Sequence, residues 1–517
     1  MREEELKFGV HGRFELPDLA AALGKGHRVD ERGRLVLTAV YYDTVDLRLA
    51  RLGITLRHRT GEGGPPWHLK LPKGATGSSA AGAMVREEIA VDGPAERPPS
   101  ALTGLVTAWT RTAALVPVAT LRTDRDVYLL TDDEGTVLAE LVDDTVEVSD
   151  GRGVLADGTG VRTTFREIEV ERKADGKRAD KAMAAVSEAL TAAGAAGGSG
   201  TPKLVRALGQ RALAPPDLPV AGELTPRSSA AAAIAFVLRR SARRLLEYDV
   251  RVRRDEPDAV HQARVCCRRL RSDLRTFGPL LEAGWAAPID AELRWLAAVL
   301  GGPRDAEVLR ARLRTTAATD PLAPIDDEVL ARMDAVLGER QRRALADLKA
   351  ALDSDRYPAL LDLLIETVRE PETVELASQQ AVWVLPAMVE VVWDKLASRA
   401  GKLRLDDPDD TWHAARIRAK RARYAAEAVA PVIGGPATRL AKACAELQEV
   451  LGEHQDAAIA ADEWRDIARA HAEDTELVLT CGRLVERERT AVRAARERYD
   501  PIWASADRPS LTGWLRR

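Results

Sequence analysis

Residues 164–173 have the sequence TFREIEVERK, in which three glutamates occupy every second position. Such residues share one face of a β-strand, because strand side chains alternate between two faces. Two other stretches, EEELK at residues 3–7 and RHR at residues 57–59, show the same alternation of charge. If these faces lined a closed barrel, carboxylates and cations would be buried in one cavity at a high desolvation cost. A metal ion and a polyanion inside the cavity would neutralise them.

The length and composition are typical of a globular protein with more than one domain. The chain has 517 residues, of which 45% are hydrophobic and 30% charged, and its net charge of −4 identifies no partner. The first residues show no leader pattern, and no stretch approaches the ~18 apolar residues of a membrane span. We therefore expect a cytoplasmic protein without membrane contact. The cysteines lack metal-site spacing and are expected to pack between helices: Cys266, Cys267, Cys444 and Cys481.

The first part of the chain has the pattern of a β-rich domain. Up to about residue 210, runs such as LVLTAVYYDT and TVLAELVDDTVEV are separated by turn-rich segments. This pattern predicts at least seven strands. Helices are predicted near Leu16–Leu23 and Asp180–Ala193.

The second part of the chain has a helical pattern. Residues 214–226, APPDLPVAGELTP, are rich in proline and mark a linker. From Ser228 onward Ala, Leu, Arg and Glu recur at helical spacing, which predicts an all-α region. We expect one domain at 1–210, a linker at 211–227 and a second domain at 228–510.

The helical part repeats itself. The sequence HQARVCCRRLR at residues 261–271 returns as HAARIRAKRAR at residues 413–423. A second element follows each copy at a similar interval, LGGPRD at residues 300–305 and LGEHQD at residues 451–456. The order and spacing predict two related helical bundles that face each other.

Each repeat places basic residues along one helix face. At about 100° per residue, His261, Arg264, Arg268, Arg271 and Arg275 fall within a sector of roughly 80°. Such a face repels itself, and a bound anion would stabilise it. Arginine forks suit phosphate oxygens, so a linear polyphosphate or a nucleic-acid backbone would fit. Nucleic acid ranks lower because no aromatic residues are interleaved. The alternative is a solvated face whose cations pair with acidic residues of neighbouring helices.

These paired helices resemble those of the CHAD family, the conserved histidine α-helical domains, over nearly all of residues 228–510. The resemblance implies an all-α domain of two pseudo-symmetric bundles that binds inorganic polyphosphate through a basic face. The positions that match the family's motif are His261, Arg264, Arg268, Arg271, His413, Arg416, Lys420 and Arg423.

The first part of the chain resembles the CYTH family, also called triphosphate tunnel metalloenzymes. The resemblance implies an α+β domain, in which an eight-stranded antiparallel tunnel barrel carries flanking helices. After EEELK, the motifs follow in the family's order: Tyr42-Asp43-Thr44, Arg57-x-Arg59, Lys70, Arg86-x-Glu88, Glu140 with Asp144, Glu169-x-Glu171, and Lys203 with Arg206.

Carboxylates of this tunnel are the expected metal ligands, because hard divalent cations prefer carboxylate oxygens and bridge phosphates. Mg²⁺ or Mn²⁺ is the expected cofactor, and the sequence does not distinguish between them. Glu167 is either a further ligand or a support behind the ligands. The candidate metal ligands are Glu3, Glu5, Glu169, Glu171 and Asp144.

Cations of the tunnel are expected to bind the non-bridging phosphate oxygens. Arg122 and Arg125 are three positions apart and cannot both point inward on a regular strand, and we expect Arg122 to do so. The candidate catalytic residues are Lys7, Arg57, Arg59 and Lys70, and the candidate substrate-binding residues are Arg86, Arg122 and Lys203.

Together the two resemblances imply a metal-dependent phosphohydrolase that acts on inorganic triphosphate and carries a polyphosphate-binding domain. In two other CYTH activities, adenylate cyclisation and thiamine triphosphate hydrolysis, the same residues would bind the triphosphate group of the substrate. A third alternative is a polyphosphate-binding or granule-targeting protein whose barrel binds without turnover. The retained carboxylates favour an enzyme, because they would repel an anion in the absence of metal. The oligomeric state is left open.

Overall fold

The computed structural model describes residues 2–72, 84–150, 163–197 and 202–516, with the side chains of residues 2–4, 84–86 and 150 left out. The chain divides into two compact units, Met1–Asp217 and Leu218–Arg517. The division falls within the segment 211–227, where the sequence predicts the linker.

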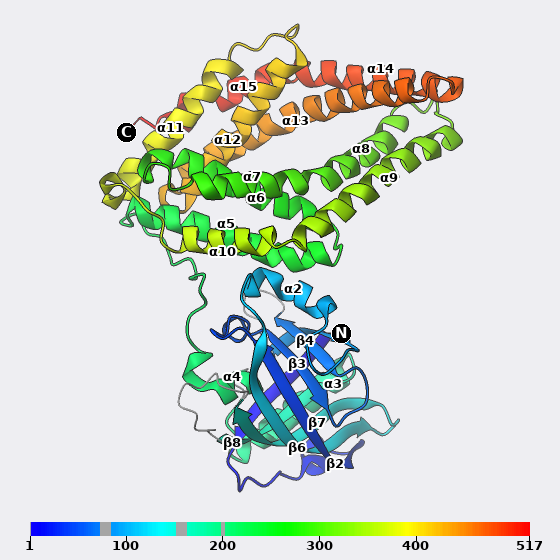
Figure 1. Ribbon diagram of the computed structural model, residues 1–517, viewed down its shortest axis with the longest axis vertical. Coiled ribbons are helices and arrows are strands. Elements are labelled where there is room, and N and C mark those ends of the chain that lie inside the picture. Colours follow the sequence, from blue (N-terminus) through cyan, green and yellow to red (C-terminus); the bar gives the residue numbers. More distant parts are fainter. Residues whose placement is uncertain (1, 73–83, 151–162, 198–201, 517) are drawn as a thin grey trace. The chain divides into compact units, whose positions relative to one another are not determined.

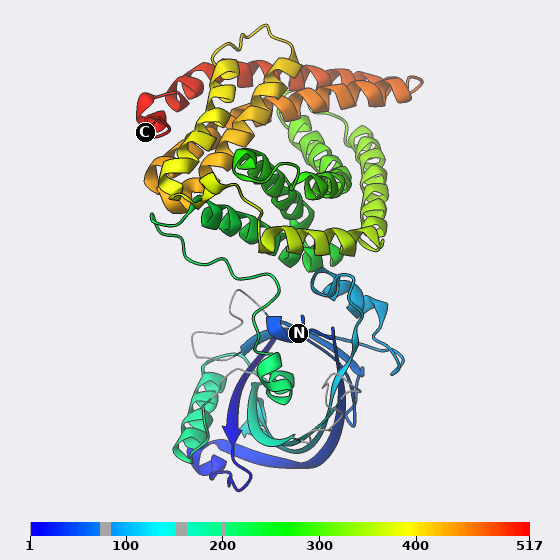
Figure 2. The same ribbon diagram turned by 60° about the vertical axis from the view of Figure 1, so that its left-hand side comes forward.

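The first unit is a closed eight-stranded antiparallel barrel, which confirms the predicted fold class (Figures 1 and 2). The strands follow one another around the barrel in the order β1-β5-β4-β3-β2-β6-β7-β8. Their bounds are β1 Arg2–Val10, β2 His27–Asp43, β3 Thr55–Thr60, β4 Trp67–Pro72, β5 Met84–Val91, β6 Val116–Asp132, β7 Val137–Asp150 and β8 Thr163–Arg172.

The register of β1, β8 and β7 brings charged residues side by side. Glu5 of β1 lies opposite Glu171 of β8, which in turn lies opposite Glu140 of β7. Two positions along, Lys7 lies opposite Glu169. Because residues opposite each other point to the same face of a sheet, these five side chains share one face.

Helices cover part of the outside of the barrel. Helix α1 (Leu19–Leu23) and helix α3 (Lys177–Ala192) pack against the strands, with Val186 of α3 in one apolar cluster with Ile168 of β8. Both helices lie where the sequence predicts them. Helix α2 (Ser100–Thr110) was not predicted, because its threonines and β-branched residues have weak helix propensity. Two 3₁₀ turns complete the unit, η1 at Ala50–Leu52 and η2 at Gly209–Arg211.

A short helix fills one end of the barrel interior. Val146 of β7 is four positions from the cavity-lining Val142, so both face inward. Leu204 and Val205 of α4 (Lys203–Leu208) belong to the same buried cluster as Val146. Helix α4 therefore closes this end with apolar side chains, and its first residue is next to the charged part of the interior.

The second unit is helical apart from two isolated β-bridges among its described residues, which confirms the predicted all-α class. Its helices and 3₁₀ turns are α5 Ala230–Arg253, α6 Ala259–Thr276, η3 Gly278–Leu280, α7 Ala287–Val299, α8 Gly301–Ala317, α9 Asp327–Leu352, α10 Arg356–Arg369, η4 Glu375–Ser378, α11 Ala381–Ala400, α12 Asp409–Ile433, α13 Gly435–Ala470, α14 Thr475–Glu497, α15 Tyr499–Ala506 and α16 Pro509–Thr512. The four cysteines are buried and unpaired in this unit, as expected of helix-packing residues. No described helix combines the length and apolar character needed to cross a membrane.

The two helical halves are related by a pseudo-twofold axis. The backbone N–H of Ala230 at the start of α5 donates to Gln379 O at 2.8 Å, and that of Ala381 at the start of α11 donates to Ser228 O at 2.8 Å. Helices α5 and α6 pack together, as do α11 and α12, and α6 also contacts α12 (Figure 1). The repeated basic stretches therefore lie on neighbouring helices near the centre of the unit.

Candidate active site and basic helical face

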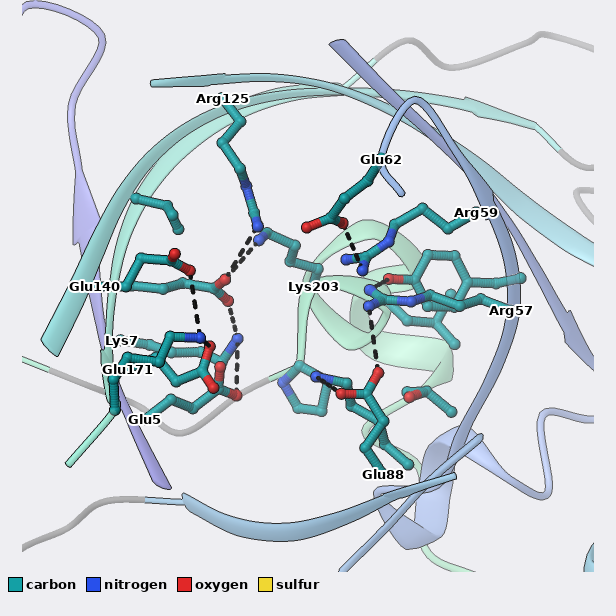
Figure 3. A pocket seen from close by; sticks show the side chains of 18 residues that line it. Glu5, Lys7, Arg57, Arg59, Glu62, Glu88, Arg125, Glu140, Glu171 and Lys203 are labelled. Atoms are coloured by element: carbon teal, nitrogen blue, oxygen red, sulfur yellow. Dashed lines mark hydrogen bonds and ion pairs between the residues drawn. The ribbon is translucent and has the colours of Figure 1, made fainter. Parts of the chain in front are cut away.

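A charged cavity of about 250 Å³ lies inside the barrel (Figure 3). Among the described residues, six carboxylates and seven cations line it. The carboxylates are Glu5, Glu62, Glu88, Glu140, Glu169 and Glu171, and the cations are Lys7, Arg57, Arg59, Lys70, Arg125, Lys173 and Lys203.

The structure brings most of the predicted tunnel residues to this cavity. Those that line it are Glu5, Lys7, Arg57, Arg59, Lys70, Glu169, Glu171 and Lys203. Glu3 and Arg86 lie on β1 and β5, but their side chains are outside the described part of the structure. Asp144 and Arg122 do not line the cavity.

Two lysines hold the acidic wall together. Lys7 Nζ lies 3.2 Å from Glu5 Oε1 and also pairs with Glu169. Lys203 Nζ lies 3.0 Å from Glu169 Oε2 and pairs with Asp144. Burial alone would lower the pKa of Lys7, but Glu169 and Glu5 raise it above its ordinary value. Burial would raise the pKa of Glu169, but Lys203 and Lys7 hold it well below its usual range. Both groups are therefore charged at neutral pH.

Glu140 is a further carboxylate of the acidic wall, and it is not among the candidate metal ligands predicted from the sequence. Lys173 Nζ lies 2.8 Å from Glu171 and 3.5 Å from Glu140, so one ammonium group bridges the two carboxylates. Glu140 belongs to a matched motif, and its strand register places it beside Glu171. No pattern in the sequence singled out Lys173.

The opposite wall carries cations around a buried phenol. Arg57 Nη1 donates to Tyr41 Oη at 3.2 Å, and Arg57 Nη2 lies 3.9 Å from Glu88. Lys70 Nζ lies 3.7 Å from the same carboxylate. Burial alone would raise the pKa of Tyr41, but Arg57, together with Lys203 and Lys70, lowers it. This wall offers donors to an anion and keeps the Tyr41 oxygen among them.

Several functional side chains were missed from the sequence. Tyr41 was overlooked because only its neighbour Tyr42 belongs to a family motif. Glu62 lies in the turn after β3 and pairs with Arg59 at 2.6 Å, and strand periodicity says nothing about turn residues. Glu167, left open between ligand and support, is buried and pairs with Arg206 at 2.6 Å, which places it behind the cavity.

The prediction that Arg122 points into the barrel is wrong. Its side chain is 48% exposed and pairs with Asp124 at 3.1 Å. Arg125 lines the cavity instead, where it donates two hydrogen bonds of 2.8 Å to Asp144 and lies 3.4 Å from Glu169. Asp144 is fully buried, so it holds Arg125 in place from behind, and its role as a metal ligand stays a prediction.

This difference gives a matched pair of variants. In an assay of tripolyphosphate hydrolysis, the activity that the CYTH resemblance implies, Arg125→Gln is expected to lower kcat/KM by about 10²-fold, because a buried charge-assisted donor is lost from the cavity. Arg122→Gln is expected to change it by less than about twofold, because exposed ion pairs contribute little. Steady-state phosphate release by the two variants checks this. Equal losses, or a larger loss in Arg122→Gln, would contradict the inward position of Arg125.

The cavity suits a hard divalent cation in its donor chemistry. Glu5, Glu171 and Glu140 provide carboxylate oxygens on adjacent strands, and such oxygens are preferred by Mg²⁺ and Mn²⁺. In the described part of the chain no three acidic, His or Cys side chains form a preassembled cage, since Lys7 and Lys173 now pair with these glutamates. A cation would therefore bind by exchanging with lysine ammonium groups.

In the helical unit, the two repeats form the same contact twice. Arg264 of α6 lies 2.6 Å from Asp305 of α8, and Arg416 of α12 lies 3.3 Å from Asp456 of α13. The glycine of each repeated LG element lies beneath its arginine, where an added Cβ would be 3.5 Å and 3.8 Å from the guanidinium nitrogens. The second element of the repeat thus supplies an acidic partner and room for the arginine.

Other predicted basic residues also have partners. Arg271 lies 2.9 Å from Asp290, and Arg423 lies 2.7 Å from Glu427. His413 Nδ1 lies 2.6 Å from the side-chain oxygen of Gln455. The alternative of a face neutralised by neighbouring carboxylates therefore describes part of the surface.

The centre of the face is different. Arg268 donates to Tyr424 Oη at 3.3 Å, and within the described ranges neither it nor Lys420 forms an ion pair. Burial, together with Arg304 and Arg268, lowers the pKa of His261. Positive charge is therefore only partly compensated by acidic residues where the two repeats meet.

Two family models match the chain, a CYTH domain at residues 1–205 and a CHAD domain at residues 236–465. A protein of Mycobacterium tuberculosis is 33% identical over 499 residues, which cover 93% of this chain and 92% of the relative. It is called Uncharacterized protein Rv2226 in strain ATCC 25618 / H37Rv and Uncharacterized protein MT2285 in strain CDC 1551 / Oshkosh. The chain belongs to the family that joins a CYTH domain to a CHAD domain.

Among solved structures, PptA from Streptomyces chartreusis covers 54% of this chain and 100% of its own, with 24% identity and a TM-score of 0.46. The CHAD domain from the plant Ricinus communis covers 54% and 95%, with 25% identity and a TM-score of 0.42. CYTH domains bind triphosphate substrates and are generally metal-dependent, and the family includes triphosphatases and cyclases. CHAD domains are linked to polyphosphate.

Proposed function

We propose that the barrel hydrolyses inorganic triphosphate with a divalent cation and that the helical unit binds inorganic polyphosphate. One observation carries the first part: one wall of a single cavity carries Glu5, Glu140 and Glu171, and the opposite wall carries Arg57 and Arg59 (Figure 3). Each set needs opposite charge nearby, because unpaired buried charges are costly. A phosphate chain with a bound cation satisfies both walls at once.

In this proposal the cationic wall grips the phosphate chain. Arg57 and Lys70 bind non-bridging oxygens, and Lys203, at the start of α4, reaches the chain from the closed end. Glu5, Glu171 and Glu140 would hold the cation, which would neutralise charge on the phosphates during phosphoanhydride cleavage. The remaining contribution of the protein is positioning, because phosphoryl transfer depends mainly on alignment and charge stabilisation.

The proposal is tested with four substrates: tripolyphosphate, thiamine triphosphate, ATP and long-chain polyphosphate. Each is incubated with Mg²⁺, with Mn²⁺ or with chelator, and phosphate, pyrophosphate and cyclic AMP are measured. Metal-dependent release that is fastest from tripolyphosphate supports the triphosphatase. Formation of cyclic AMP would replace it with a cyclase. Binding of long polyphosphate without turnover of any substrate would leave a polyphosphate adaptor.

Polyphosphate binding is expected to depend on pH through Lys420. Burial, followed by the charges of Arg416 and Arg268, lowers the pKa of Lys420 to about 7, while Asp456 opposes the shift. A bound anion favours the protonated amine, so affinity should rise several-fold as the pH falls from about 8 to 6. Titration with polyphosphate at both pH values checks this. In Lys420→Met this increase in polyphosphate affinity at lower pH should be smaller. In Lys442→Met, a control at an exposed position of α13, the increase should be unchanged.

The same shift predicts an opposite effect on the unbound protein. The folded pKa of Lys420 lies below its ordinary 10.5, so the unfolded chain binds the extra proton between about pH 7 and 10.5. Folding stability should therefore rise with pH across this window. Lys420→Met should flatten the rise in thermal midpoint, and an unchanged slope would contradict the assignment.

A further inference from the structure

The pseudo-twofold relation of the helical unit is broken at one place. Arg269 of α6 and Glu427 of α12 form an ion pair with a 2.6 Å contact. Counting from the repeated histidines, the equivalent positions in the other repeat are occupied by Arg421 of α12 and Arg275 of α6. Where one side of the axis has an acid and a base, the other side has two cations.

A second carboxylate of the first repeat also has no acidic counterpart in the other repeat. Burial raises the pKa of Asp273 to about 7, and the charges of Arg269 and Arg240 oppose this shift. The position equivalent to Asp273 in the other repeat is Ala425. The second site therefore lacks both acidic side chains that balance the arginines of the first.

A cavity of about 400 Å³ lies at this unbalanced site, between α6, α11 and α12. Three arginines of α6, three basic residues of α12 and Lys395 of α11 line it. No carboxylate belongs to its lining among the described residues. The volume is in the range of small-molecule sites.

Some of the basic residues that line this cavity form ion pairs, and others form none in the described ranges. Asp290 lies 2.9 Å from Arg271 and 3.4 Å from Arg275, and so balances two of the three arginines of α6. In the described ranges Arg421 has no ion pair, and burial together with Arg275 lowers its pKa. Arg418 donates to the backbone oxygen of Lys395 at 3.1 Å. The α12 side of the cavity is therefore the part that an anion would stabilise.

The cavity also has an apolar surface. Ile417 of α12 is 39% exposed, and Val392 of α11 and Tyr424 of α12 line the same cavity. An inorganic phosphate chain gains nothing from apolar side chains. A ligand that joins phosphate to a compact, flat organic group can use both surfaces, because arginine planes and aliphatic side chains pack against a base while guanidinium groups bind phosphate.

We propose that this cavity binds a nucleotide, with its phosphates on Lys420, Arg421 and Arg268 and its base against Ile417 and Val392. The site is separate from the barrel cavity and does not depend on the hydrolysis proposed for it. It shares Arg268, Arg271 and Lys420 with the basic face expected to bind polyphosphate, whereas Arg421, Ile417 and Val392 belong to this cavity and not to that set.

Two probes with the same diphosphate group test the proposal, ADP and inorganic pyrophosphate. Both are titrated calorimetrically into the full chain in chelator, so that metal-dependent turnover is absent. ADP is expected to bind at least about tenfold more tightly than pyrophosphate, because adenosine adds apolar contact at similar charge. Equal or tighter binding of pyrophosphate would overturn the proposal.

Three variants localise the site. Ile417→Ser should reduce ADP binding to the level of pyrophosphate and leave pyrophosphate unchanged. Arg421→Glu should weaken both by more than about tenfold while keeping or raising the thermal midpoint, because the new carboxylate faces Arg275. Arg439→Gln, which removes an exposed charge of α13 away from the cavity, should change neither.

Two outcomes overturn the assignment while the protein stays folded. One is ADP binding that survives Arg421→Glu. The other is ADP binding that is lost in Lys203→Met, since this would place the nucleotide in the barrel. A failure here leaves tripolyphosphate hydrolysis measurable in the same preparations, so it is distinguishable from a failure of the proposed function.

Discussion

Replacing Glu5 and Glu171 together with glutamine is expected to lower metal-dependent hydrolysis of tripolyphosphate by at least about 10³-fold. Each carboxylate faces the cavity and pairs with a lysine, Glu5 with Lys7 at 3.2 Å and Glu171 with Lys173 at 2.8 Å. Without their charge the cavity loses oxygen donors for a divalent cation, while phosphate can still bind to the cationic wall. The loss should therefore be in kcat, with little rise in KM.

The control for this double variant is Glu147→Gln, which removes an exposed carboxylate of the same barrel. It should retain full activity. Binding of long-chain polyphosphate to the helical unit should be unchanged in both. Turnover within tenfold of the parent protein, measured as phosphate release with saturating Mg²⁺ or Mn²⁺, would rule out a metal role for these glutamates. Thermal midpoints show whether the double variant is folded.

The second large effect is expected on the helical unit. Arg264→Gln together with Arg416→Gln should weaken polyphosphate binding by about 10²-fold at low salt, because each arginine provides a charge-assisted donor at equivalent places in the two repeats. The dependence of affinity on salt should also become shallower, since fewer cations take part. Tripolyphosphate hydrolysis by the barrel should remain within about twofold.

Arg439→Gln with Arg469→Gln provides the matched control, because both residues are exposed cations of α13. This pair should alter polyphosphate affinity little. Affinity that is unchanged in the Arg264 and Arg416 double variant would favour the other reading of the basic face, in which Asp305 and Asp456 simply neutralise it. Titration at several salt concentrations separates the two.

Strand periodicity predicted a β-rich domain with charged residues on shared strand faces, whereas the closed eight-stranded barrel was implied by the resemblance to the CYTH family. The spacing of the glutamates in TFREIEVERK is sufficient to place Glu169 and Glu171 on one face of a strand. In the structure both side chains line the cavity. Arg122 and Arg125 show the limit of this reasoning. Spacing alone requires the two to point to opposite faces, but only the pairing with β7, where Arg125 lies opposite Asp144, decides which is inside.

The helical repeat was visible in the sequence, but its asymmetry was not. HQARVCCRRLR and HAARIRAKRAR share their basic positions, so each predicts the same face. Glu427 and Arg275 occupy equivalent positions just beyond the matched segments. Their effect on the charge of the two sites depends on the contact between α6 and α12, which the sequence does not show. The neutralising partner Asp290, on α7, was likewise hidden, because sequence spacing does not show contacts between separate helices.

Helix α4 has a consequence for the direction in which a phosphate chain can move. Leu204 and Val205 occupy one end of the barrel together with inward-facing residues such as Val146. These apolar side chains disfavour passage of a charged phosphate chain at this end, so a linear chain is expected to enter and leave from the opposite end. Long polymers would then present only a terminus to the reacting groups, whereas a free tripolyphosphate can lie wholly inside. The barrel would then select its substrates by chain length, and this selection would depend on the six residues of helix α4 rather than on any charged side chain.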